Sequence, residues 1–152
     1  MYQHILVPLD GSDAAERGLR EAVSLAADHK ARLRLLNVVD TLSFGAVEMS
    51  AIVDMEELIA DLRRQGDRLL LLAQSRATEV GVTSEAVQRE VKGTPVADAI
   101  VDEATRHGCD LIVMGTHGRR GLRRMALGSD AELVVRASPV PVLLVRQPEA
   151  RT

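Results

Sequence analysis

The sequence has almost no aromatic residues. Among 152 residues there are one tyrosine, one phenylalanine and no tryptophan, so aliphatic side chains and methionine must build the core. Proteins that recognise single-stranded nucleic acid usually stack its bases on aromatic side chains. The net charge of −3 also provides no general attraction to a polyanion. We therefore expect no nucleic-acid partner.

Cysteine and long apolar runs are equally scarce. Cys109 is the only cysteine, which excludes an intramolecular disulfide or a thiolate metal site and fits a reducing compartment. No apolar run is long enough to cross a bilayer, and no secretory leader precedes the first apolar segment. The histidines are too scattered to suggest a metal site. The composition favours a soluble cytoplasmic protein without a membrane partner.

Hydrophobic periodicity predicts alternating strands and helices in one domain spanning residues 1–152. The expected strands share short apolar runs: 4–10, 32–39, 83–91, 111–114 and 142–145. The expected helices share apolar residues three or four positions apart: 13–29, 52–80, 95–107 and 129–137. Because the crossovers are too long for hairpins, we predict a doubly wound, Rossmann-like or flavodoxin-like α/β fold, a parallel five-stranded sheet with helices on both faces.

Local signals predict where these elements end. Two residues are expected to cap helices: Asp13 and Thr94. Gly81 is placed just beyond the long helix, and Gly66 inside that helix is interpreted as a modest cost. The weak alternation of residues 83–91 predicts an edge strand, and residues 41–50 are expected to form a mobile loop.

In such a fold a ligand lies beyond the carboxyl ends of the strands at the topological switch point, here most simply between the first and fourth strands. Two loops should meet there, 8–12 and 115–129. Gly115 and Gly118 would let backbone N–H groups approach a phosphate and would permit positive φ. Ser129, at a helix start that favours anions, either donates to a phosphate or caps its own helix.

The second loop is also rich in cations, with four arginines: Arg119, Arg120, Arg123 and Arg124. Guanidinium groups suit bidentate phosphate contacts, and we expect at most two to touch a ligand. His117 is more typical of a hydrogen-bonding loop residue than of an acid or base. Neither the dinucleotide motif nor the Walker motif is present. A response-regulator pocket needs a lysine near the end of the last strand, and the only lysines are Lys30 and Lys92.

The spacing Gly115-x₂-Gly118-x₉-Gly128-Ser129 resembles the nucleotide-binding signature of the universal stress protein family. The resemblance also includes residues 5–12, 110–119 and 139–145, so it covers nearly the whole chain. Every position of the signature is kept. The resemblance therefore implies membership of the ATP-binding branch rather than of the branch that lacks the glycines.

The resemblance implies an ATP site residue by residue. Asp10 would hydrogen-bond the ribose or adenine side, with Pro8 and Leu9 alongside. Val38 would wall the adenine and Met114 would contact the nucleoside, whereas Val39 is interpreted as core. Six residues would surround the phosphates: Gly115, His117, Gly118, Arg119, Gly128 and Ser129.

The function implied is that of a nucleotide-dependent regulatory or stress-response protein. Its cofactor would be ATP, with Mg²⁺ optionally held through water by Asp10 or Asp13, and the apolar strand 140–145 would form the homodimer contact common in the family. No evident base or carboxylate pair indicates catalysis. Two alternatives stay open: a nucleotide-free interaction module, and a slow ATPase or self-phosphorylating protein with Ser12, Thr116 or Ser129 as acceptor.

Overall fold

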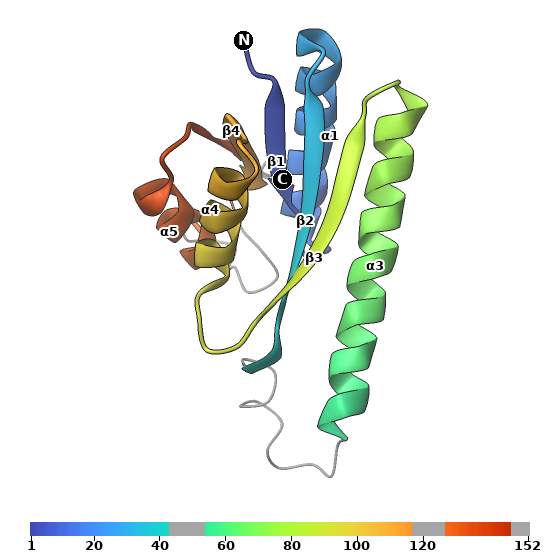
Figure 1. Ribbon diagram of the computed structural model, residues 1–152, viewed down its shortest axis with the longest axis vertical. Coiled ribbons are helices and arrows are strands. Elements are labelled where there is room, and N and C mark those ends of the chain that lie inside the picture. Colours follow the sequence, from blue (N-terminus) through green and yellow to red (C-terminus); the bar gives the residue numbers. More distant parts are fainter. Residues whose placement is uncertain (43–53, 117–126, 147–152) are drawn as a thin grey trace, which may run out of the picture.

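The structure is a computed structural model, and it describes residues 1–42, 54–116 and 127–146. Strands and helices alternate along these residues (Figure 1). The strands are β1 (His4–Pro8), β2 (Arg32–Asp40), β3 (Ser84–Val91), β4 (Leu111–Gly115) and β5 (Val142–Val145). The helices are α1 (Asp13–His29), α3 (Met55–Glu79), α4 (Val96–Arg106) and α5 (Ser129–Ala137). The loop expected at 41–50 lies almost entirely outside the described residues.

The described strands form one parallel five-stranded sheet in the order β3-β2-β1-β4-β5. This confirms the doubly wound α/β fold. β3 lies at one edge, as its weak alternation predicts, and β5 lies at the other. Since β2 and β4 flank β1 on opposite sides, the winding direction reverses between β1 and β4, and this is the switch point that we expected.

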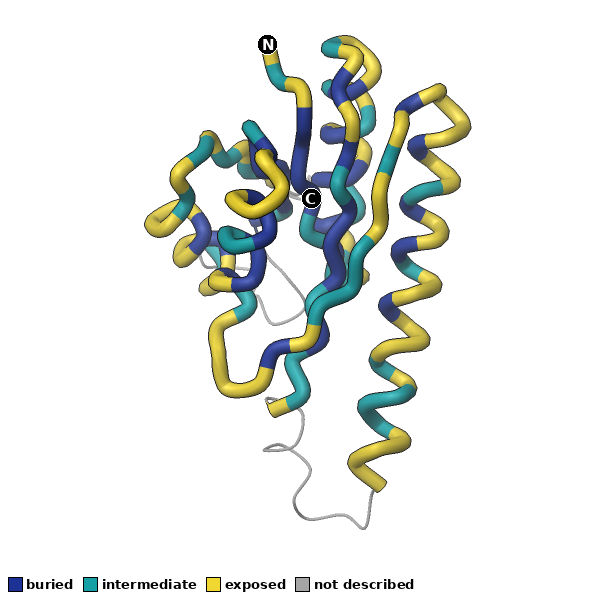
Figure 2. The backbone as a smooth tube through the Cα atoms, in the orientation of Figure 1, coloured by how far each residue is buried: buried dark blue, intermediate teal, exposed yellow. Residues whose placement is uncertain are grey.

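The sheet separates two apolar layers, one on each face. Ile5 and Val7 pack with residues of α1 and α3, whereas Leu6 on the same strand packs with residues of α4 and α5. Buried backbone is concentrated in the central strands and on the inward sides of the helices (Figure 2). Both layers are almost entirely aliphatic, as the shortage of aromatic residues requires. Within the described ranges, no helix combines the length and apolarity needed to cross a membrane.

Two predicted helix caps are wrong by one position. Ser12, not Asp13, caps α1, and its hydroxyl accepts a hydrogen bond of 3.1 Å from the Ala15 N–H. Pro95 occupies the cap position of α4, where no side chain accepts a cap hydrogen bond, so Thr94 does not cap that helix. The extended backbone of Pro95, with ψ of 140°, delays the first helical residue to Val96.

The glycines of α3 are explained by geometry. Gly81 has φ of +75°, which confirms the glycine expected just beyond the helix. The interpretation of Gly66 as a simple cost is wrong, because a Cβ atom there would collide with the side-chain amides of Asn37 and Gln88. At Gly66, α3 therefore lies directly against these side chains of β2 and β3.

A buried charge network, which the sequence analysis missed, joins β2 and β3 to α4. Glu103 is only 3% exposed, and its carboxylate accepts hydrogen bonds from Arg34 at 2.6 Å and from Arg89 at 3.1 Å. Arg34 also binds Glu85 at 2.6 Å. Arg89 donates to Asp102 at 2.8 Å, and this bond lowers the pKa of the Asp102 carboxyl. Partners supplied by three elements allow these charges to lie inside a mainly apolar interface.

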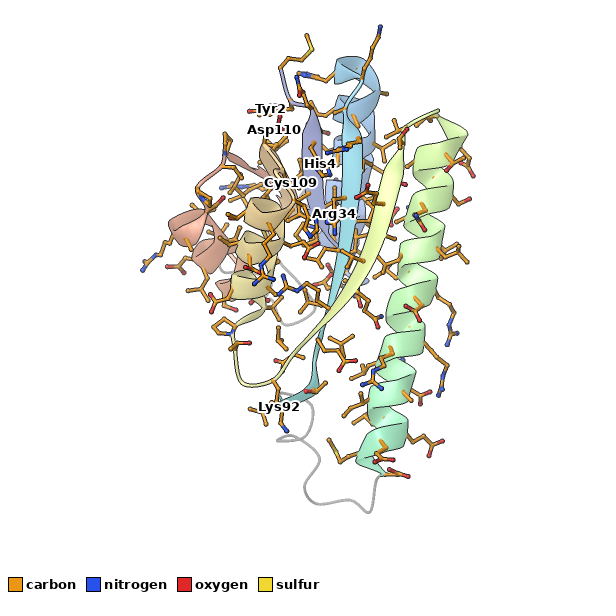
Figure 3. The ribbon with its side chains drawn as sticks, viewed as in Figure 1. Tyr2, His4, Arg34, Lys92, Cys109 and Asp110 are labelled. Atoms are coloured by element: carbon orange, nitrogen blue, oxygen red, sulfur yellow. The ribbon has the colours of Figure 1, made fainter. Side chains whose placement is uncertain are left out.

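A second group of polar residues, Asp110, His4 and Cys109, lies at the amino ends of β1 and β4 (Figure 3). The Asp110 carboxylate accepts the Gln3 and His4 backbone N–H groups at 2.8 and 3.0 Å. His4 Nδ1 donates to the His107 carbonyl at 3.1 Å, and burial lowers the pKa of His4. Burial likewise raises the pKa of the Cys109 thiol to about 11, so the thiol stays protonated. The hydrogen bonds of Asp110 and His4 join the start of β1 to the residues that precede β4.

Breaking the charge network from one side should be costly. We predict that Glu103→Leu lowers the free energy of unfolding by about 3 kcal/mol, the low end for a broken buried ion pair because Arg34 keeps Glu85. The double variant Arg34→Met/Glu103→Leu should regain most of this loss. Urea unfolding measures both.

The exposed pair Arg63–Glu90 provides the control. Its side chains are 49% and 41% exposed, so Arg63→Leu should change the free energy of unfolding by less than about 1 kcal/mol. A loss for Glu103→Leu no larger than the loss for Arg63→Leu would show that the network does not stabilise the fold.

Candidate functional site

The first wall of the site is the turn after β1. The Leu9 N–H donates to the Leu36 carbonyl at 2.7 Å, which extends the pairing with β2 by one residue. The Asp10 carboxylate accepts the Ser12 N–H at 2.9 Å and so closes the turn. Gly11 has φ of +80°, a conformation that only glycine adopts readily. The turn therefore presents Asp10 at the carboxyl edge of the sheet.

The second wall begins at the end of β4, where Gly115 meets α1. A Cβ atom at Gly115 would lie 2.5 Å from the carbonyl carbon of Ala14 and 2.7 Å from its side chain. The φ of Gly115 is not positive, so the expected left-handed conformation is wrong for this residue. Its glycine is needed because α1 packs directly on the strand end. Gly118, the other glycine of that expectation, lies outside the described residues.

The third wall is the start of α5. Gly128 is the N-cap, with φ of −67° and ψ of 154°, and as a glycine it has no side chain to make a cap hydrogen bond. Ser129 is the first helical residue, so the interpretation of Ser129 as a cap is wrong. The Gly128 N–H donates to the Thr116 carbonyl at 2.6 Å, which ties this helix start to the end of β4. A helix start without a side-chain cap is suited to an anion.

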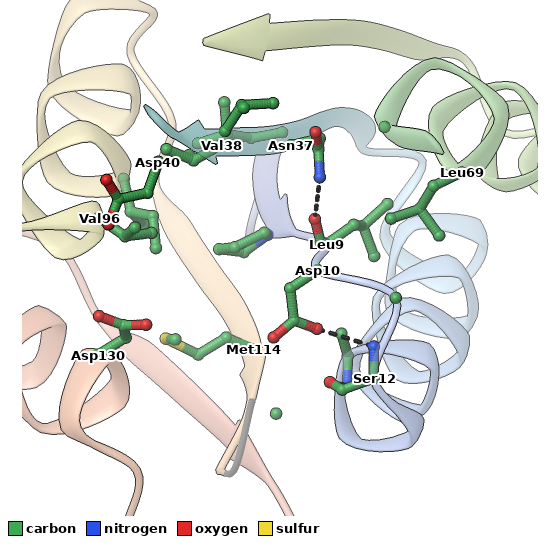
Figure 4. A pocket seen from close by; sticks show the side chains of 18 of the residues that line it. Leu9, Asp10, Ser12, Asn37, Val38, Asp40, Leu69, Val96, Met114 and Asp130 are labelled. Atoms are coloured by element: carbon green, nitrogen blue, oxygen red, sulfur yellow. Dashed lines mark hydrogen bonds between the residues drawn. The ribbon is translucent and has the colours of Figure 1, made fainter. Parts of the chain in front are cut away.

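These walls enclose a cleft with a volume of about 800 Å³ at the carboxyl edge of the sheet (Figure 4). Such a volume lies within the usual range of small-molecule sites. Eight residues named from the sequence line this one cleft: Pro8, Leu9, Asp10, Val38, Met114, Gly115, Gly128 and Ser129. The other three, His117, Gly118 and Arg119, lie outside the described residues, as do Arg120, Arg123 and Arg124.

The cleft has an apolar interior and a polar rim. Leu9, Val38 and Met114 supply apolar surface, and Figure 4 shows Asp10 and Asp130 opposite each other across the Met114 side chain. Val39 is 5% exposed, which agrees with its interpretation as core, although it too borders the cleft. Apolar walls with a few polar groups suit a flat base attached to a polar, anionic group.

Helix α3 contributes a wall that the sequence analysis missed. Leu62 and Leu69 line the cleft from this helix, together with the polar residues Gln65 and Arg68. Their apolar spacing predicts a buried helix face but does not show which loop that face meets. Only the packing of α3 along β2 and β3 brings them to the site.

The positions of the two lysines argue against a response-regulator pocket. Lys30 is the left-handed cap of α1, and Lys92 follows β3. Neither lines the cleft, so the described residues do not form a response-regulator pocket. In the described ranges no group of three or more His, Cys, Asp or Glu residues is placed to hold a metal ion.

Fold and cleft together define an α/β protein with a small-molecule site at the switch point of a parallel sheet. The chain belongs to the universal stress protein family, whose model, described as "Universal stress protein family", matches residues 1–146. Universal stress protein MJ0531 of Methanocaldococcus jannaschii is 36% identical over 150 residues, covering 98% of this chain and 85% of that protein. The solved structure of hypothetical protein MJ0577 superposes with a TM-score of 0.83 at 29% identity, covering 99% of each chain.

Two similar solved structures contain adenine nucleotides. A universal stress protein in complex with cAMP has a TM-score of 0.64 at 29% identity, covering 95% of this chain and 97% of that chain. The universal stress protein from Archaeoglobus fulgidus in complex with dAMP has a TM-score of 0.64 at 25% identity, covering 94% and 97%. Nucleotide binding therefore occurs among the structural neighbours of this chain.

The contact between Gly115 and α1 can be tested by adding one methyl group. We predict that Gly115→Ala lowers the free energy of unfolding by about 1–3 kcal/mol, because the new Cβ overlaps the backbone of Ala14. Gly18→Ala is the matched control, since its Cβ would lie 3.2 Å from the Gly115 nitrogen and require only a small shift. Equal losses in urea unfolding would contradict a special demand for glycine at position 115.

Proposed function

We propose that this single-domain chain is an ATP-binding universal stress protein of the cytoplasm, in which bound nucleotide stabilises one conformation or assembly and so regulates a stress response. The observation that carries the proposal is the start of α5, whose cap residue is a glycine without a side chain and which borders a cleft with apolar walls. The adenine nucleotides bound by two structural neighbours support the choice of ligand. The lone, buried Cys109 fits a reducing cytoplasm.

The proposal assigns each part of ATP to a part of the cleft. Adenine packs on Val38 and Met114, and Asp10, beside Pro8 and Leu9, hydrogen-bonds the ribose or adenine side. The phosphates lie against residues that follow β4 or begin α5: Gly115, His117, Gly118, Arg119, Gly128 and Ser129. An accompanying Mg²⁺ would be held through water by Asp10 or Asp13.

A carboxylate placed at the proposed phosphate position should repel ATP without harming the helix. An acidic residue in the first turn complements the helix dipole, so Ser129→Glu should fold normally. We predict that it weakens ATP binding at least about tenfold in titration calorimetry, since two like charges would be forced together, and leaves adenosine binding nearly unchanged.

Arg136→Gln is the matched control. It changes the net charge by the same amount on the same helix, but its side chain is 73% exposed and does not line the cleft. ATP affinity should stay at the wild-type value. If Ser129→Glu binds ATP as well as the wild type does, the phosphate assignment is wrong. If the wild type gives no heat with any adenine nucleotide and is purified ligand-free, the proposed function is wrong.

Regulation by nucleotide binding does not require a hydroxyl group that accepts a phosphate. Of the three hydroxyl residues considered as acceptors, two are poorly placed. The Ser12 hydroxyl already accepts the Ala15 N–H, and Thr116 is only 2% exposed. Of the three acceptors considered for self-phosphorylation, Ser129 alone combines partial exposure with a place at the start of α5. We therefore favour a binding protein over a phosphotransfer enzyme.

We also propose a homodimer through residues 140–145. β5 is an edge strand, and its Leu143 side chain is 36% exposed. An exposed apolar edge strand readily pairs with a second copy across a two-fold axis. We predict that Leu143→Arg shifts the protein from dimer to monomer in solution scattering at micromolar concentration.

The control for the dimer is Leu71→Arg. Leu71 is 67% exposed on α3, beside the opposite edge of the sheet, so the same charge there should leave the dimer intact. A monomeric wild-type protein, or equal dissociation by both variants, would contradict the proposed interface.

A further inference from the structure

The carbonyl of Leu9 has an unusual partner. The registered pairing of β1 with β2 ends at Pro8 and Leu36, so the Leu9 carbonyl lies beyond the last pair of the ladder. The side-chain amide of Asn37 donates to it at 2.8 Å, a buried hydrogen bond that Figure 4 draws. The hydrogen bond from the Asn37 side chain thus satisfies a carbonyl that the backbone pairing of β1 with β2 does not reach.

Asn37 is itself held from the far side of β2. It is 7% exposed, and its Oδ1 atom accepts a long hydrogen bond of 3.4 Å from Gln88 Nε2 on β3. The same Gln88 amide donates to the Arg63 carbonyl of α3 at 2.9 Å. Gly66 leaves room for both amides, because a Cβ atom there would collide with each of them. With Oδ1 facing Gln88, the amide nitrogen of Asn37 is directed at Leu9.

The position of Leu9 determines that of Asp10. Asp10 follows directly in the chain, and its carboxylate closes the turn through the Ser12 N–H at 2.9 Å. Leu9 is therefore anchored on two sides by β2, through the Leu36 carbonyl and the Asn37 amide. Losing the Asn37 bond would leave a buried carbonyl unsatisfied and release the residue next to Asp10.

We propose that Asn37 is a positioning residue for the nucleotide, which acts through the Leu9 carbonyl to hold Asp10 against the nucleoside. This inference rests on the proposed function, because it assumes that Asp10 contacts the ligand. Asn37 itself borders the cleft, but on the side of Leu9 and Val38, away from the proposed phosphate position. Its loss should therefore weaken the binding of adenosine and of ATP by the same factor, unlike a change at Ser129.

The experiment is a double-variant cycle measured by calorimetry with ATP and with adenosine. Asn37→Leu keeps the approximate volume and removes the donor, and we expect both affinities to fall about tenfold, the equivalent of one buried hydrogen bond. In the Asp10→Ala background, Asn37→Leu should change the remaining affinity by less than about twofold, because the group that it positions is gone.

Two further variants keep the test decisive. Leu33→Ala alters a fully buried residue at the amino end of the same strand, so it should lower the melting temperature without changing either affinity. Gln88→Leu, on the edge strand, is a milder change and should lower both affinities about threefold by loosening Asn37. It replaces Asn37→Leu in the cycle if that variant does not fold.

The outcomes separate the two claims. A wild type that binds no adenine nucleotide overturns the proposed function and this inference with it. A wild type that binds, with Asn37→Leu binding equally well, overturns the role of Asn37 alone. The same holds if the two losses are fully additive with Asp10→Ala, or if Leu33→Ala weakens binding as much as Asn37→Leu does.

Discussion

The start of α5 is the constraint on which the site depends. A helix amino terminus carries N–H groups without intrahelical partners and a partial positive charge, and here the cap residue, Gly128, has no side chain to bind them. The sheet order then decides what this charge faces. Because β4 lies beside β1, the end of β4 and the turn at Asp10 meet at one edge, and α5 begins beside that meeting point. A ligand that joins an anion to an apolar group suits this environment, because the anion can bind the helix start and the apolar group can pack on the walls of the cleft.

Contacts elsewhere in the fold position that edge of the sheet. Gly18 and Gly115 bring α1 onto the end of β4, and Gly66 brings α3 onto β2. On the opposite face, Glu103 binds two arginines of the sheet, which ties α4 to β2 and β3. Since α4 begins at the cleft, its packing also helps to define the adenine side. The charge network, Gly18 and Gly66 thus serve the geometry of the site although no contact with the proposed ligand is assigned to them, whereas Gly115 is also a proposed phosphate contact.

Much of this arrangement could be predicted from the sequence. Unbroken apolar runs such as 111–114 indicated buried parallel strands, and the alternation with helices gave the doubly wound fold and its switch point. The spacing of Gly115, Gly128 and Ser129 predicted site residues, and the structure places all three along one cleft. These signals are local, or depend only on the order of elements, and so a sequence can carry them.

The predictions that failed, and the features that were not predicted, depend on how the helices and strands pack against one another. Ser129 has the pattern of a cap, yet Gly128 takes that position, so the cap depends on how the preceding residues enter the helix. From the sequence, Gly66 only lowers the stability of helix α3. The packing of α3 on Asn37 shows that a larger residue would not fit there. Asn37 itself looks like one polar residue within an apolar strand. Only the parallel pairing of β1 with β2 brings its amide to the Leu9 carbonyl, and no local pattern shows this.

A crystal structure of the protein with ATP tests the central claim most directly. The account predicts that the adenine lies against Val38 and Met114 and that phosphate oxygens lie within hydrogen-bonding distance of the first N–H groups of α5. A nucleotide bound elsewhere, or a cleft that stays empty in crystals grown with saturating ATP, would contradict it.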